Sequence, residues 1–190
     1  FNLTLVGTTL GIQKAGGTTI VELTNFASGR YGITLNAASG AINGTNGADN
    51  LQGTGDADII NGLGGNDTIN GGAGGTDQIS AGEGNDTVTV SGAGSIVYGD
   101  GGADSITASG ANTTLDGGEG DDVLVASGAG SRMLGGGGAD RVTVTGANAV
   151  VEAGTGNDTI TVNAAAAGAS IRGGADNDTI TVNLTSGTAT

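Results

Sequence analysis

The sequence predicts an all-β fold in which the chain winds into a parallel β-solenoid, and three observations support this. Aliphatic residues recur with a period of nine along most of the chain, and a glycine-rich run ending in aspartate precedes most of them. Gly accounts for 42 of the 190 residues, whereas Pro, Cys, His and Trp are absent. Burial must therefore come from many small aliphatic side chains in thin layers, and their periodicity argues against a disordered linker.

The repeating unit is a glycine-rich turn that ends in aspartate. Successive aspartates are separated by 9, 9, 10, 9, 18, 18, 18, 18 and 20 residues. An aliphatic residue lies two positions after each, as Val88 follows Asp86, and each 18-residue step contains a second aliphatic half-way, such as Val97. The underlying period is nine, with small insertions near 71–77 and 163–171. The ten aspartates are Asp49, Asp58, Asp67, Asp77, Asp86, Asp104, Asp122, Asp140, Asp158 and Asp178.

Each nine-residue unit predicts one turn and one short strand, so two units complete a coil of 18 residues. Stacked coils form two parallel sheets with strands about 4.8 Å apart, and roughly eight coils make a rod about 40 Å long. Side-chain alternation points Val88 and Val90 into the rod and Thr87 and Thr89 outward. Glycine is suited to the turns because it accepts a positive φ.

The charge of the chain favours a cation as its partner. The formal net charge is −14 with five basic residues, which excludes nucleic acid as a natural partner because phosphates are bound by Lys and Arg. No apolar run predicts membrane insertion. Aspartates repeating along one edge of the rod would repel one another strongly. Ca²⁺ between successive turns removes this conflict, since it takes six to eight oxygen ligands from carboxylates and carbonyls.

Four turns resemble the nonapeptide G-G-x-G-x-D-x-U-x of haemolysin-type (RTX) calcium-binding repeats, in which U is aliphatic. They are "GLGGNDTIN" from Gly62, "AGEGNDTVT" from Ala81, "GGEGDDVLV" from Gly117 and "AGTGNDTIT" from Ala153. The resemblance covers about 44–182. It implies a calcium β-roll in which each ion is held between adjacent coils by turn carbonyls and the motif aspartate, so that all ten aspartates are metal ligands.

Parity predicts which aspartates share an edge, because residues about 18 apart lie on the same side of the rod. Asp58 and Asp77 are expected alone on one edge, and the other eight aspartates on the opposite edge. We expect about seven ions along one edge and one opposite, seven or eight in total, which would roughly cancel the charge of −14. Asp56 and Asp176 replace the usual fourth-position glycine, which leaves the geometry of their turns open. Where a motif aspartate would otherwise fall, the 18-residue repeats have Ser95, Thr113, Ser131 and Ala149.

The residues expected to face outward offer two further interpretations. A contiguous apolar patch would form a packing surface for another protein. A turn of the type x-G-T-G-N-D is also similar to the ice-binding region of a giant bacterial adhesin, but only Thr155 and Asn157 reproduce its outward pair. The residues of the expected patch are Ile96, Tyr98, Leu134 and Val150, near Arg132 and Arg172.

Three segments are expected. Residues 1–34 break the motif but keep the alternation of β-strands in "FNLTLVG", "TTIVELTNF" and "RYGITL", which predicts an N-terminal β segment, a cap or calcium-free coils. Residues 35–183 form the β-roll, with calcium turns mainly along one edge, and 184–190 form a polar C-terminal tail.

The chain is predicted to be non-catalytic, because it has no His or Cys and no G-x-S-x-G elbow. We predict an extracellular or cell-surface calcium-binding β-roll of bacterial origin, which folds on calcium binding after secretion. It would be a structural subunit or segment of a surface layer, matrix fibre or adhesin, with self-association or neighbouring surface proteins as partners besides calcium. The alternative is a C-terminal calcium-binding repeat domain of a secreted enzyme or toxin, and an ice-binding adhesin region is the third interpretation.

Overall fold

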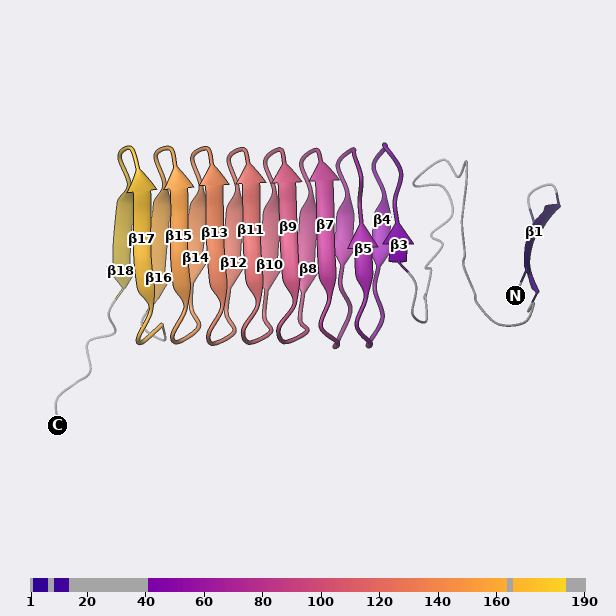
Figure 1. Ribbon diagram of the computed structural model, residues 1–190, viewed down its shortest axis with the longest axis horizontal. Helices are drawn as coiled ribbons and strands as arrows, with labels where there is room; N and C mark the ends of the chain where they lie inside the picture. The colour runs from indigo at the N-terminus through magenta and orange to yellow at the C-terminus, as the bar shows by residue number, and fades with distance from the viewer. Residues whose placement is uncertain (1, 7–8, 14–40, 164–165, 184–190) are drawn as a thin grey trace.

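The computed structural model describes residues 2–6, 9–13, 41–163 and 166–183, and its main body is a β-solenoid of two parallel eight-stranded sheets (Figure 1). The strands alternate between the two sheets along the chain. The odd sheet contains β3 (Ala41–Asn43), β5 (Ile59–Asn61), β7 (Gln78–Glu83), β9 (Ile96–Gly101), β11 (Thr114–Glu119), β13 (Arg132–Gly137), β15 (Val150–Thr155) and β17 (Ser170–Ala175). The even sheet contains β4 (Asn50–Gln52), β6 (Thr68–Asn70), β8 (Thr87–Val90), β10 (Ser105–Ala108), β12 (Val123–Ala126), β14 (Arg141–Val144), β16 (Thr159–Asn163) and β18 (Thr179–Asn183).

The strand register confirms the predicted coil length. In the even sheet Ser105 pairs with Val123, 18 residues further on, and the same step recurs through most of both sheets. The step lengthens to 19 between β6 and β8 and to 20 between β16 and β18. The extra residues lie in the turns near 71–77 and 163–169, where the sequence predicted insertions. Insertions in turns leave the strands in register, so the columns of inward side chains continue past them.

Columns of aliphatic side chains from both sheets fill the interior. Val88 and Val90 are buried while Thr87 and Thr89 are exposed, as the alternation predicted. Small residues such as Ala108 and Ala126 occupy the second inward position where the two sheets approach the turn. The buried residues at the aliphatic position of the motif are Ile42, Leu51, Ile60, Ile69, Ile79, Val88, Val97, Ile106, Leu115, Leu124, Met133, Val142, Val151 and Ile160.

The coil formed by β17 and β18 is the most exposed part of the roll. Ile180 is 47% exposed and Val182 is 55% exposed, although they stand in the inward columns. The described residues place no strand beyond β18, so these side chains are covered from one side only.

The N-terminal segment contributes one hairpin. Strands β1 (Asn2–Val6) and β2 (Thr9–Gln13) pair antiparallel, with Val6 opposite Thr9. The predicted strands in "TTIVELTNF" and "RYGITL" and the predicted tail 184–190 lie outside the described residues. No helix among the described residues is long and apolar enough to cross a membrane.

Candidate metal centre

The turns of the roll form two edges. We call the turns that lead from the odd to the even sheet the aspartate edge, which lies along the top of Figure 1, and the turns that lead back the opposite edge. Asp58 and Asp77 lie on the opposite edge, just before β5 and β7. The structure therefore confirms the predicted parity. The residues of the aspartate edge are Asp49, Asp67, Asp86, Asp104, Asp122, Asp140, Asp158 and Asp178.

On the aspartate edge each carboxylate ties its own coil to the preceding one. The backbone N–H of Asp104 donates to Asp122 Oδ1 over 2.8 Å, and the N–H of Asp122 donates to Asp140 Oδ1 over 2.9 Å. The same bond links every pair of neighbours from Asp49 to Asp178. The side chains of Asp104 and Asp122 are only 1% exposed, so these bonds are shielded from water. Oδ1 of each aspartate of this edge from Asp67 to Asp178 is thus used in a hydrogen bond between coils.

The second carboxylate oxygen is buried without a partner. A buried acceptor that lacks a hydrogen bond costs about 1–3 kcal/mol, and more when it is charged. Buried polar groups are paired in folded proteins, so a row of unpaired oxygens indicates a missing donor or ion. The orphaned atoms are Oδ2 of Asp67, Asp77, Asp86, Asp104, Asp122, Asp140 and Asp158.

A backbone carbonyl of the next coil lies near the orphaned oxygen in turns of the aspartate edge. A methyl group placed on Gly117 would lie 2.3 Å from Asp122 Oδ2 and 2.6 Å from the carbonyl oxygen of Gly135 in the next coil. A methyl group on Gly135 would lie 2.3 Å from Asp140 Oδ2 and 2.2 Å from the carbonyl oxygen of Ala153. An unpartnered carboxylate oxygen and a carbonyl oxygen therefore converge inside these two turns. Such oxygen-only surroundings suit a hard cation such as Ca²⁺.

Left-handed glycines let the turns approach one another. Gly118 has a φ of +101° and Gly120 a φ of +125°, the second and fourth positions of one turn. A methyl group on Gly118 would lie 2.1 Å from the carbonyl oxygen of Asp100 in the preceding coil. Asp176, which replaces the fourth-position glycine, adopts the same conformation with a φ of +76°, whereas Asp56 does not. Of the two aspartates that replace the fourth-position glycine, only Asp176 therefore keeps the left-handed conformation.

The buried carboxyls hold protons more tightly than ordinary aspartates. Burial is the largest of the causes that raise the pKa of Asp104 to about 7; neighbouring carboxylates also raise it, and the Asp86 N–H lowers it. The same causes, with burial the largest, raise three other pKa values to about 6: those of Asp67, Asp122 and Asp140. These buried carboxyls therefore bind a proton more readily than ordinary aspartates do, and a cation beside them would offset the same cost of burying the charge.

Within the described ranges, no group of three or more His, Cys, Asp or Glu side chains gathers in one place. An ion on the aspartate edge would take one carboxylate oxygen and complete its shell from backbone carbonyls. Ca²⁺ accepts backbone carbonyls in flexible geometry, so the residues present fit this ion.

Neutral hydroxyls replace the aspartate at three consecutive positions of the opposite edge: Ser95, Thr113 and Ser131. Ser95 Oγ accepts the N–H of Asp77 over 3.0 Å and donates to the carbonyl of Gly92 over 2.9 Å. Ser131 Oγ likewise donates to the carbonyl of Gly128, and it lies 3.0 Å from Thr113 Oγ1. A hydroxyl joins the coils as Asp Oδ1 does but leaves no charged oxygen behind. Sequence analysis placed these residues where a motif aspartate would otherwise fall, but missed the bridging role of the hydroxyls.

Three of the ten predicted ligands have a different environment, and one of them, Asp178 in the last coil, is only partly buried. Asp49 Oδ2 accepts hydrogen bonds from Thr45, and Asp58 Oδ2 accepts them from Thr54. All ten aspartates therefore occupy turns as predicted, but protein donors satisfy the second oxygen in Asp49 and Asp58.

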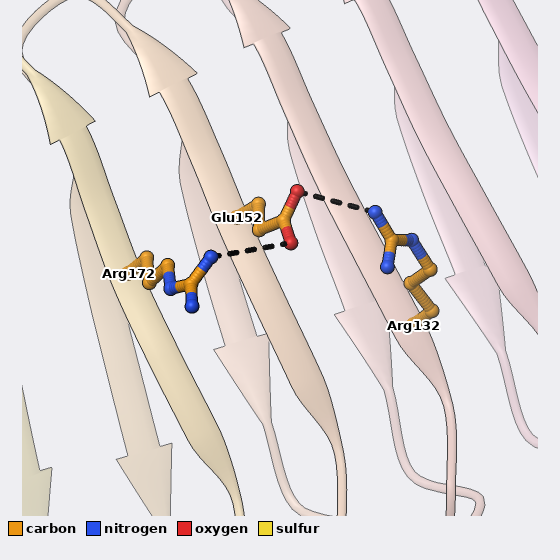
Figure 2. Close-up of polar contacts among 3 residues, drawn as sticks. All are labelled: Arg132, Glu152 and Arg172. Atoms are coloured by element: carbon orange, nitrogen blue, oxygen red, sulfur yellow. Dashed lines mark hydrogen bonds and ion pairs between the residues drawn. The ribbon is translucent and has the colours of Figure 1, made fainter.

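The outer face of the odd sheet has its own charged group. Glu152 on β15 lies between Arg132 on β13 and Arg172 on β17, with N–O distances of 3.1 and 4.0 Å (Figure 2). Tyr98 on the same face is 45% exposed, which agrees with its predicted outward position. Because these side chains lie on the outer face, the ion pairs connect neighbouring coils independently of the turns.

Comparison with known proteins agrees with this geometry. The family model of the RTX calcium-binding nonapeptide repeat matches residues 43–75, 74–88, 90–124, 98–133, 116–148, 143–166 and 170–184. Searches of curated proteins and of solved structures return no significant match. The matched segments span most of the roll, and they confirm the resemblance that the turns carry. The chain belongs to the family of RTX calcium-binding nonapeptide repeats.

Proposed function

We propose that this chain is a structural β-roll that folds when its turns bind about seven calcium ions. The observation that carries this function is the set of seven buried carboxylate oxygens without a hydrogen-bond donor. Six of them lie on the aspartate edge, and Asp77 Oδ2 lies on the opposite edge. Each ion would neutralise the carboxylate beside it and allow the coils to stack without repulsion.

Different residues of each turn would have different roles in binding an ion. The motif aspartate supplies the charged oxygen, and its position is set by the Oδ1 bond to the preceding coil. The carbonyl of the first turn residue in the next coil, such as Gly135 for Asp122, faces the same space. Left-handed residues at the second and fourth positions keep side chains out of it. Because the ligands come from two coils, the complete site exists only in the folded chain, and binding free energy becomes folding free energy.

This coupling supports a role outside the cell. A chain that stays unfolded while calcium is scarce and folds where calcium is abundant is suited to secretion in an extended state. We infer that the roll serves as a rigid segment of a bacterial surface layer, matrix fibre or adhesin, without catalytic activity. The regular rod with exposed Thr rows such as Thr87 and Thr89 supports a scaffold role.

Far-ultraviolet circular dichroism tests the calcium-dependent fold. With millimolar calcium the spectrum should show β-structure, and removal of the ion with a chelator should abolish it at pH 7. Magnesium at the same concentration is the control, because it demands a rigid octahedral shell and dehydrates reluctantly. A spectrum that is identical with calcium and with chelator would contradict the proposal.

Electron microscopy of the same preparations tests the scaffold role. Self-assembly predicts filaments or sheets in calcium that disappear in chelator. Monodisperse monomers in calcium would instead favour the alternative function, a calcium-binding repeat domain that serves a secreted enzyme or toxin.

A further inference from the structure

Two turns near the start of the roll differ from the later calcium turns in the hydrogen bonds that the motif aspartate accepts. In the turn 53–58, the backbone N–H of Thr54 donates to Asp58 Oδ2 over 2.6 Å, and the Thr54 hydroxyl lies 3.0 Å from the same oxygen. In the turn 44–49, the N–H and hydroxyl of Thr45 make the same contacts with Asp49 Oδ2, at 2.6 and 2.9 Å. Two hydrogen-bond donors thus occupy the oxygen that is orphaned elsewhere.

The backbone conformation of the second turn residue separates the two kinds of turn. A β-branched residue with positive φ is a steric outlier, and neither Thr45 nor Thr54 adopts a positive φ. The second residue is left-handed in every turn whose aspartate has an orphaned oxygen. In chain order these residues are Leu63, Gly72, Gly82, Asp100, Gly118, Gly136 and Gly154.

Oδ2 of the motif aspartate cannot accept the two hydrogen bonds from threonine and bind a calcium ion at the same time. A carboxylate oxygen that accepts an amide hydrogen and a hydroxyl hydrogen has positive hydrogens where a cation would approach. The remaining oxygen partner is nevertheless in place, because a methyl group on Gly44 would lie 2.5 Å from the carbonyl of Gly62 and 2.9 Å from Asp49 Oδ2. The second residue of the turn therefore decides between a donor pair and an ion.

We propose that Thr45 and Thr54 determine which turns take calcium: their N–H and hydroxyl groups replace the ion at Asp49 and Asp58. The first ions are then bound at Asp67 on the aspartate edge and Asp77 on the opposite edge. The coil from Gly44 to Asn61 forms its turns without calcium. It therefore provides folded strands with which the next coil can pair. This inference rests on the proposed calcium-dependent function and concerns how the ions are distributed.

Counting bound ions by native mass spectrometry at saturating calcium tests this assignment. Asp49→Asn and Asp58→Asn should bind as many ions as the unmodified chain, whereas the matched variant Asp86→Asn should bind one fewer. Loss of one ion in either of the first two variants would overturn the inference. A chain that binds no calcium at all would instead overturn the proposed function.

A gain-of-site variant tests the role of the threonine directly. Thr45→Gly changes the turn 44–49 to G-G-N-G-A-D, which completes the motif up to its aspartate. It removes the hydroxyl and permits a left-handed φ, so it should bind one ion more than the unmodified chain. Thr45→Ser, which keeps both donors, is the control and should leave the count unchanged. An unchanged count in Thr45→Gly would show that Thr45 does not decide calcium binding.

Discussion

The two oxygens of a motif aspartate do different work. Oδ1 of Asp122 accepts a backbone N–H and would be needed with or without an ion, whereas Oδ2 is buried, charged and unpartnered. On the opposite edge Ser95 performs only the first task, because its hydroxyl accepts the backbone N–H of Asp77 in the preceding coil. The difference between a calcium turn and a neutral turn is therefore one oxygen atom and its charge.

Asp122→Asn separates these two tasks. The amide keeps an acceptor for the Asp104 N–H but replaces the orphaned oxygen with a nitrogen that cannot bind calcium. The variant should lose one ion and, at a calcium concentration one hundred times the Kd of that site, about 2.7 kcal/mol of unfolding free energy. Urea unfolding combined with ion counting measures both quantities. Ser131→Ala is the control: it should reduce stability by about 1–3 kcal/mol without changing the number of ions.

The raised pKa values predict how the calcium-free chain responds to pH. A carboxyl whose pKa is about 6 to 7 in the fold but 3.8 when unfolded binds its proton more tightly in the folded state. This contribution to stability is fully present below pH 3.8 and is lost as the pH rises through 6 to 7. Far-ultraviolet circular dichroism of metal-free protein should therefore show β-structure near pH 4 that is lost as the pH rises towards 7. With calcium the trend should reverse, because the ion competes with protons, and a rise in metal-free stability over this range would contradict the assignment.

The strands and turns of the roll tolerate change to different degrees. Strand positions need only an aliphatic side chain of suitable size, as the column that includes Leu115, Met133 and Val151 shows. Turn positions are more demanding, because each is packed against the equivalent backbone of the preceding coil. The outer ion pairs of Glu152 lie at exposed side chains, and such pairs contribute only about 0.2–1 kcal/mol. The turns therefore determine whether the coils can stack.

Two glycine substitutions test this demand on the turns. Gly118→Ala forces a left-handed residue with a methyl group 2.1 Å from the carbonyl of Asp100. The left-handed conformation alone costs roughly 1–2 kcal/mol, and the clash adds to it. Gly55→Ala is the matched control, since a methyl group there meets no atom within 4 Å. Thermal unfolding in calcium should show a clear loss of stability in Gly118→Ala and little change in Gly55→Ala; equal effects would mean that turn packing is not limiting.

At the scale of the whole molecule, the periodicity of the sequence predicted the architecture. A period of nine with aliphatic residues in register implies both sheets, both edges and the parity that isolates Asp58 and Asp77. The antiparallel pairing of β1 with β2 was not predictable, because a hairpin strand and a solenoid strand share the same two-residue alternation. The distinct state of Asp49 and Asp58 was also missed, since it depends on the φ of one turn residue and on a backbone nitrogen 2.6 Å from the carboxylate oxygen.

The central claim is that calcium occupies the orphaned carboxylate oxygens, and the number of ions bound by the folded chain tests it most directly. Native mass spectrometry should show a folded species carrying about seven calcium ions, one for each of the seven orphaned Oδ2 atoms, and these should be lost together with the fold in chelator. A folded species that carries no calcium at pH 7 would contradict the claim.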